Sequence, residues 1–248
     1  MSKNFFPGKV FRVGQVLEQR IGFLLIADIS GFTQFIKIHD VKKKPLIGSI
    51  VASYWESHAE VLIKDLLEVI IATFEPCMKL NKIEGDAAFF FLEDNGTDVQ
   101  ANAILEHMET AREAFNKRQK ELTFVESCPC DPCQQSKNLK LKIVVHYGSF
   151  HETTIRSFSE LSGKDVILVH RLLKNSINLS EYWLMTKQFL SLVNRPMNLK
   201  ITEIKEKIDD FGKISLDLVT FETEKSFWET KSIFFKIKNF PKMLLYYR

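Results

Sequence analysis

The chain has 248 residues, of which 45% are hydrophobic and 26% are charged, and this composition is typical of a globular protein. A net charge of +3 is too small to indicate a nucleic-acid-binding protein. The apolar stretches are too short to span a bilayer, and the N-terminus lacks the long apolar region of a signal peptide. We therefore expect a cytoplasmic protein that partners neither nucleic acid nor a membrane.

The first half of the chain alternates between short apolar runs, typical of buried strands, and longer segments with helical spacing. The elements predicted there are a strand over 22–28, a helix that begins near Gly31, a helix over 46–67, a strand over the β-branched run 69–74, and two strands over 79–92 with a turn at Gly85 and Asp86.

The second half opens with an amphipathic segment whose apolar positions keep helical spacing. The elements predicted there are that helix over 98–122, a strand over 139–146 ended by Tyr147 and Gly148, a helix over 166–174, a strand over 182–185, a helix over 186–193, and closing strands over 201–207 and 212–221.

This order of strands and helices predicts an α+β fold. We expect one domain over residues 21–221, interrupted by a Cys-rich excursion at about 125–137. Residues 1–20 are predicted as an N-terminal extension and residues 222–248 as a C-terminal appendage.

Two acidic motifs carry the first chemical signal. Asp28 ends an apolar run and Asp86 lies between two apolar runs, each close to a glycine. A buried carboxylate is costly unless something pairs with it, and two carboxylates side by side suit a hard divalent cation. The alternatives are that Asp28 caps a helix and that Asp86 serves a hairpin turn.

These motifs belong to a set of four segments, 26–33, 82–87, 144–148 and 163–172, which together resemble the class III nucleotidyl cyclase homology domain in order and spacing. The resemblance covers residues 21–221 and is closest to a bacterial cyclase-like subgroup without an assigned function. It implies a ferredoxin-like core with a mixed or antiparallel sheet and helices packed on it. It also implies conversion of ATP to cyclic AMP and pyrophosphate, with two Mg²⁺ or Mn²⁺ ions.

The resemblance also implies roles for individual residues. Metal ligands would be the carboxylates of Asp28 and Asp86 and the backbone carbonyl of Ile29, and backbone amides next to them would bind the phosphates. The residues in this phosphate-binding segment are Gly31, Phe32 and Thr33.

Lys82 and Glu160 match the positions that select the base. A Lys donor together with a carboxylate acceptor favours adenine, so the resemblance implies ATP rather than GTP. Arg171 matches the catalytic residue that stabilises the transition state. Where the family has an Asn that orients the ribose, this chain has Ile167. The alternative function is therefore a weak or inactive nucleotide-binding signalling module. For Arg171, the alternative is a surface ion pair with an acid such as Asp165.

In the family that this chain resembles, metal-binding and base-selecting residues come from two different chains, so a homodimer is implied. The sequence leaves open a heterodimer with a second cyclase-like chain.

A second chemical signal is the CxCxxC motif of Cys128, Cys130 and Cys133. Clustered thiolates suit Zn²⁺, and a closed site needs a fourth ligand, which Cys77, a His or a Cys of a second chain would supply. The alternatives are free thiols in a loop and a redox switch.

Overall fold

The computed structural model describes residues 18–31, 48–97, 99–194, 199–221 and 232–248. The strands are β1 (Gln19–Ser30), β2 (Lys79–Glu84), β3 (Ala87–Glu93), β4 (Lys140–Ile155), β5 (Phe158–Ser162), β6 (Tyr182–Thr186), β7 (Ile201–Ile208) and β8 (Gly212–Thr220). The helices are α2 (Gly48–Phe74), α3 (Val99–Glu121), α4 (Asp131–Gln135), α5 (Lys164–Leu173), α6 (Lys187–Leu190) and α7 (Ile233–Tyr246), with the 3₁₀ helices η2 (Leu122–Ser127) and η3 (Ser136–Asn138).

The strands form one mixed sheet in the order β2-β3-β1-β4-β6-β8-β7, with β5 paired to β4. Strand β1 is antiparallel to both β3 and β4, while β6 runs parallel to β4. The first four strands therefore have the order 4-1-3-2 and are joined by α2 and α3, which is the ferredoxin-like arrangement. The predicted α+β fold with a ferredoxin-like core is confirmed.

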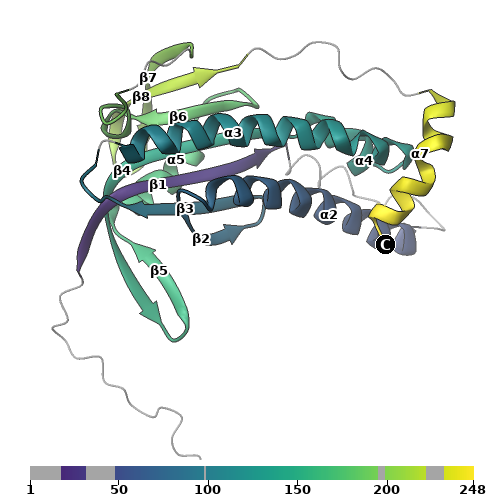
Figure 1. Cartoon of the computed structure of the whole chain (residues 1–248), viewed down its shortest axis with the longest axis horizontal. Coiled ribbons are helices and arrows are strands. Elements are labelled where there is room, and N and C mark those ends of the chain that lie inside the picture. Colours follow the sequence, from purple (N-terminus) through teal and green to yellow (C-terminus); the bar gives the residue numbers. More distant parts are fainter. Residues whose placement is uncertain (1–17, 32–47, 98, 195–198, 222–231) are drawn as a thin grey trace, which may run out of the picture.

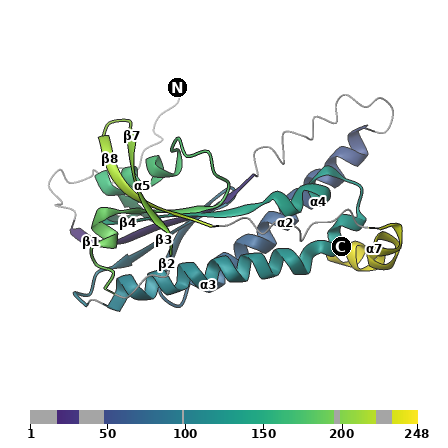
Figure 2. The same cartoon turned by 90° about the horizontal axis from the view of Figure 1, so that it is seen from above.

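Helices cover both faces of the sheet (Figure 2), with α2 and α3 on one side and α5 on the other. Successive side chains of a strand point to opposite faces. On β1, Leu25 and Ala27 pack in the core under α2 and α3, whereas Leu24 and Ile26 pack in the core under α5. The same alternation places Asp28 on the α5 face, at the end of the strand.

The prediction of a strand over residues 69–74 is wrong, because these residues form the last turns of α2. Leu66, Ile70 and Phe74 are buried at intervals of four residues, so the helical spacing continues through the β-branched run. Tertiary burial of this stripe outweighs the weak strand preference of the residues between.

The prediction that a strand ends at Tyr147 and Gly148 is also wrong. Strand β4 continues to Ile155 and returns as β5, and the two form a hairpin that projects from the sheet (Figure 1). Strand β5 was not predicted, and it carries Glu160. Helix α7 was not predicted either, and it lies beside α4 at one end of the molecule (Figure 2).

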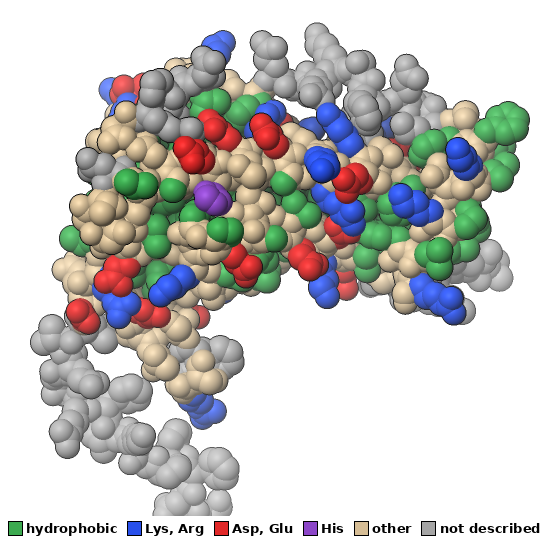
Figure 3. All heavy atoms as spheres, viewed as in Figure 1, with side chains coloured by type: hydrophobic (Ala, Val, Ile, Leu, Met, Phe, Trp, Pro, Cys, Tyr) green, Lys and Arg blue, Asp and Glu red, His purple; other side chains and the backbone are tan. Residues whose placement is uncertain are grey.

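The face covered by α2 and α3 carries charges of both signs, and hydrophobic side chains gather at the end where α7 lies (Figure 3). The exposed large hydrophobic residues of α7 are Ile233, Phe234, Ile237, Phe240, Leu244 and Leu245. Within the described ranges, the helices lack the combination of length and apolar character that crossing a membrane requires.

Candidate functional site

Asp28 and Asp86 lie next to each other at the end of β1. In the register of β1 with β3, Asp28 pairs with Ala87, the residue that follows Asp86. The backbone N–H of Ile29 donates a hydrogen bond to the backbone carbonyl of Asp86, with 3.1 Å between nitrogen and oxygen. This contact joins the strand end to the β2–β3 turn, so the two carboxylates that the sequence singled out share one site.

Both carboxyl groups are costly to ionise in this site. Burial and the nearby charge of Asp86 raise the pKa of Asp28 from 3.8 to about 6, and burial also raises the pKa of Asp86. A divalent cation between them would remove this penalty, and carboxylate oxygens are the ligands that hard cations prefer. The residues present therefore fit a site for a hard divalent cation.

Lys142 provides a positive charge at this site. The sequence analysis did not identify this residue. It pairs with Asp28 in the β1–β4 register and acts to lower the pKa of both Asp28 and Asp86. Its Nζ atom lies 5.3 Å from the centroid of the Tyr182 ring. The sequence contains no local signal for this neighbour, because only the strand pairing brings residue 142 to residue 28.

Two glycines allow the chain to bend around the carboxylates. Gly31, directly after β1, has a φ of 96°, and Gly85, in the β2–β3 turn, has a φ of 67°. Residues with a Cβ rarely adopt such angles, so glycine is required for both bends. Phe32 and Thr33, expected to bind phosphate, and the helix expected to begin near Gly31 lie outside the described residues.

The residues expected to select the base meet on the α5 face. Lys82 on β2 and Glu160 on β5 form an ion pair with 3.6 Å between Nζ and Oε2. Glu84, which sequence reasoning missed, lies 3.1 Å from the Lys82 ammonium and 3.4 Å from His170 Nδ1. Burial lowers the pKa of His170. Glu84 follows Lys82 by two residues and so shares its face of the strand.

Arg171 is separate from this group. Its guanidinium forms ion pairs with Asp210 at 2.8 Å and Asp209 at 3.6 Å, both in the β7–β8 turn. Asp165, proposed from the sequence as an alternative partner, instead accepts hydrogen bonds from the backbone N–H and hydroxyl of Ser149. Ile167, one turn before Arg171, is 52% exposed.

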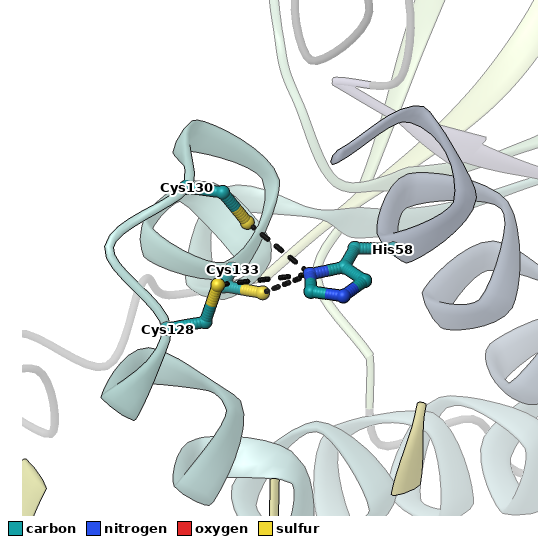
Figure 4. A group of neighbouring side chains, drawn as sticks. All are labelled: His58, Cys128, Cys130 and Cys133. Carbon is teal, nitrogen blue, oxygen red and sulfur yellow. Dashed lines mark hydrogen bonds between the residues drawn. The ribbon is translucent and has the colours of Figure 1, made fainter. Parts of the chain in front are cut away.

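The cysteine motif forms a compact cluster with a histidine of α2 (Figure 4). The sulfur atoms of Cys128, Cys130 and Cys133 lie 3.6, 3.5 and 3.6 Å from His58 Nδ1. All four side chains are buried, and their potential ligand atoms lie within 4.8 Å of one another. The cluster does not include Cys77, which lies just after α2 and is partly buried.

Hydrogen bonds with Cys130 and Cys133 lower the pKa of Cys128. Hydrogen bonds with Cys128 and Cys130, together with burial, raise the pKa of Cys133. The sequence-based prediction of a fourth ligand allowed for a histidine but did not identify His58. A signal existed, because His58 continues the buried stripe of Leu62 and Leu66 at intervals of four residues.

A family model described as "Protein of unknown function (DUF2652)" matches residues 63–182. The chain is 34% identical over 158 residues to "Uncharacterized protein Rv2561/Rv2562" of Mycobacterium tuberculosis, covering 64% of this chain and 73% of that protein.

Solved structures that superpose on this chain include cyclase domains. The adenylyl cyclase CyaB from P. aeruginosa superposes with a TM-score of 0.56 at 13% identity, covering 85% of this chain and 99% of that one. The guanylate cyclase domain of RhGC from Catenaria anguillulae, in complex with GTP, superposes with a TM-score of 0.54 at 11% identity, covering 83% and 100% of the two chains. The fold is thus that of class III nucleotidyl cyclase domains.

Proposed function

The chain belongs to the family of the Mycobacterium tuberculosis protein Rv2561/Rv2562, and from its class III cyclase fold we propose that it is a nucleotidyl cyclase that converts ATP to cyclic AMP and pyrophosphate. The observation that carries this proposal is the proximity of Asp28 and Asp86 at the end of β1, where burial and the charge of Asp86 raise the pKa of Asp28 to about 6. A pair of carboxylates held at such a cost suits a site that binds cations.

In this mechanism the carboxylates of Asp28 and Asp86, with the backbone carbonyl of Ile29, would hold Mg²⁺ or Mn²⁺. When bound, the ions neutralise the phosphates and lower the pKa of the ribose 3′-hydroxyl that attacks the α-phosphate. The bend at Gly31 turns the chain out of β1 beside the carboxylates. Backbone amides of Gly31, Phe32 and Thr33 bind the phosphates in this proposal.

Lys82 and Glu160 read the base. The Lys82 ammonium donates a hydrogen bond to adenine N1, and the Glu160 carboxylate accepts one from the 6-amino group. Their 3.6 Å separation supports this assignment, because adenine N1 and the 6-amino nitrogen are both bonded to C6 and present an acceptor and a donor side by side on one edge of the base. Guanine presents a donor and an acceptor in the reverse order, so the pair favours ATP over GTP.

Arg171 stabilises the charge that develops on the α-phosphate. In the free protein Asp210 and Asp209 hold its guanidinium, and both acids are well exposed in a turn. Exchange of these partners for a phosphate is feasible, because exposed ion pairs contribute only about 0–1 kcal/mol.

The active form in this proposal is a homodimer with sites shared between the two chains. Within one chain, Asp28 is affected by the charges of Asp86 and Lys142, whereas Lys82 is held by Glu84 and Glu160. The two halves of the site thus have separate partners in the described chain. A second copy would bring the metal-binding half of one subunit against the base-binding half of the other.

Product formation by the purified full chain tests the proposal, with ATP and GTP compared in the presence of Mn²⁺ and of Mg²⁺. We expect cyclic AMP from the wild type and no product from the Asp86→Ala variant. Glu75→Ala is the matched control, because Glu75 is an exposed acid just after α2. Equal product from wild type and Asp86→Ala would reject the two-carboxylate mechanism.

A second candidate function is a module that binds a nucleotide without cyclising it. Ile167 favours it, because an exposed aliphatic side chain stands where the ribose-orienting Asn is expected. This candidate predicts Mn²⁺-dependent binding of ATP by the wild type, loss of binding in Asp86→Ala, and no cyclic product at high protein concentration.

A further inference from the structure

The His58 cluster has a geometry that hydrogen bonds do not explain. Three sulfur atoms lie at nearly equal distances, 3.5–3.6 Å, from the single Nδ1 atom of His58. A ring nitrogen has either one proton or one lone pair in the plane of the ring, so it forms one good hydrogen bond. It cannot form a hydrogen bond with all three sulfur atoms at once, so hydrogen bonds of His58 do not account for three nearly equal distances, even though the thiols also contact one another.

A tetrahedral metal ion explains all three distances at once. With a Zn–S bond of about 2.3 Å and a Zn–N bond of about 2.0–2.1 Å, tetrahedral angles place each sulfur about 3.6 Å from the nitrogen. The observed distances agree with this value. Figure 4 shows the three sulfur atoms and Nδ1 of the histidine directed toward one another.

We propose that His58 and the three cysteines of the CxCxxC motif bind one structural Zn²⁺ ion. Three thiolates and one imidazole are a ligand set typical of zinc, and binding releases the thiol protons to solvent. The site has four protein ligands and no exposed side chain, with Cys130 and Cys133 fully buried. A closed site of this kind stabilises a fold and leaves no open position for a substrate.

The protein around the cluster supports this role. The hydroxyl of Tyr247 lies 3.2 Å from Cys133 Sγ, and its ring stacks on the His58 ring with centroids 3.6 Å apart. The side-chain amide of Gln134 donates hydrogen bonds to the backbone carbonyls of Glu126 and Cys128, which fixes the loop that carries the first ligand. Such surrounding contacts orient the ligands of a metal site.

The zinc ion would join two parts of the chain that are distant in sequence, and a third part packs against the site. His58 comes from α2, the cysteines come from the segment between α3 and β4, and Tyr247 directly follows α7. Strand β4 begins seven residues after Cys133 and carries Lys142, whose charge acts on Asp28. The ion therefore fixes the start of the strand that supplies one side of the carboxylate site.

The first test is the metal content of the full chain, purified without chelators and supplied with zinc. We expect one zinc ion per chain. Replacement by Co²⁺ should give the visible absorption of a tetrahedral site and a near-ultraviolet charge-transfer band from three thiolates. This measurement needs no variant, so a folding defect cannot confuse it. A protein without zinc after this treatment, with all four thiols equally reactive, would overturn the proposal.

Variants identify the ligands. His58→Ala and Cys130→Ser should weaken zinc binding by more than the roughly 10–100-fold that is typical when a contact around the ligands is lost. His58→Cys should retain one equivalent because a fourth thiolate replaces the imidazole. Cys77→Ser is the matched control and should retain full zinc with an unchanged Co²⁺ spectrum. Loss of zinc in Cys77→Ser, or full retention in both His58→Ala and Cys130→Ser, would contradict the assignment.

Zinc release by thiol titration separates this site from a redox switch. A mercurial reagent should release one zinc ion as three thiols react, and the Cys77 thiol should react without release. A wild type that holds a disulfide within the motif and takes up no zinc after reduction would reject the structural zinc site. These outcomes do not depend on cyclase activity, so the zinc proposal and the proposed function can fail independently.

Discussion

Lys82 and Glu160 face each other from β2 and β5, with 3.6 Å between the Lys82 Nζ atom and the Glu160 Oε2 atom. The two residues are separated by 78 positions in the sequence and meet only because the β4–β5 hairpin returns alongside β2. The backbone carbonyl of Ser159, next to Glu160, accepts a hydrogen bond from Asn81 Nδ2 at 3.4 Å, which ties the two strands together. A donor and an acceptor are thus held side by side.

This pair leads to a prediction about nucleotide choice. Lys82→Met keeps most of the side-chain length but removes the donor, so we expect kcat/KM for ATP to fall about 10–100-fold with little change for GTP. Lys79→Met, at the start of the same strand, is the control, because Lys79 lies against the Phe91 ring. An equal fall for both nucleotides would show that Lys82 supplies general charge and does not read the base.

The raised pKa of Asp28 predicts that the ionised carboxylate required for product formation lowers the stability of the metal-free protein. In the folded protein Asp28 holds its proton up to about pH 6, whereas in the unfolded chain it ionises near 3.8. The metal-free protein therefore loses stability as the pH rises through this window, by an amount on the order of 3 kcal/mol. Asp28→Asn, which cannot ionise, should stabilise the protein by about 1–3 kcal/mol at pH 7.5 and abolish product formation.

Urea unfolding without added Mg²⁺ or Mn²⁺ measures this effect, and chelators are avoided because they would remove zinc. The contrasting variant is Asp94→Asn, because Asp94 accepts a hydrogen bond from the Tyr147 hydroxyl at 2.6 Å. That variant should destabilise the protein by about 1 kcal/mol. Destabilisation by both variants would contradict the cost assigned to the ionised Asp28.

The sequence singles out both carboxylates, because each Asp ends or interrupts an apolar run close to a glycine, and such a signal is local. Their role as metal ligands stays a prediction. For the proposed zinc site, the sequence predicts the three cysteines but does not identify the histidine. The CxCxxC spacing is local, but His58 lies 70 residues before the first cysteine, on a helix whose length was underestimated. His58 already lies in the helix predicted over 46–67, and its spacing of four residues from Leu62 would have placed it on the buried stripe.

Contacts that depend on strand pairing are the least predictable. Nothing near Lys142 in the sequence points to Asp28, and nothing near Glu160 indicates a strand. Both positions follow from the register of β4, which continues past Gly148 even though glycine is often found at strand ends. In the structure this glycine lies within β4, opposite Gly22 of β1.

A shared site predicts that two inactive variants will complement each other. Asp86→Ala lacks the metal-binding half and Arg171→Ala lacks the transition-state half, so each alone should be inactive or nearly so. Mixing them in equal amounts should restore about a quarter of wild-type activity, since half of the dimers would be mixed and each would hold one intact site. Activity that stays at the level of the separate variants would contradict a site shared between exchanging subunits.

Tyr247 allows a test of the surroundings of the zinc site without removal of a ligand. Tyr247→Phe keeps the ring that stacks on His58 but loses the hydroxyl near Cys133 Sγ. We expect zinc affinity to fall about 10-fold, measured by competition with a chromophoric chelator. Tyr246→Phe is the control: its hydroxyl bonds Asp65 at 2.7 Å, so its loss should leave zinc affinity unchanged. Equal effects of the two variants would indicate a general loosening of the C-terminal helix.

Ile167 decides between the two candidate functions. Its side chain is 52% exposed on α5, one turn before Arg171, so a polar replacement should not disturb the core. If the site cyclises nucleotides, Ile167→Asn supplies a hydrogen bond to the ribose and should raise kcat on the order of 10–100-fold. Val99→Asn, at an exposed residue at the start of α3, controls for the added amide. If Ile167→Asn binds ATP as tightly as the wild type does and still yields no cyclic product, the missing Asn is not what limits the reaction, and the nucleotide-binding module becomes the better account.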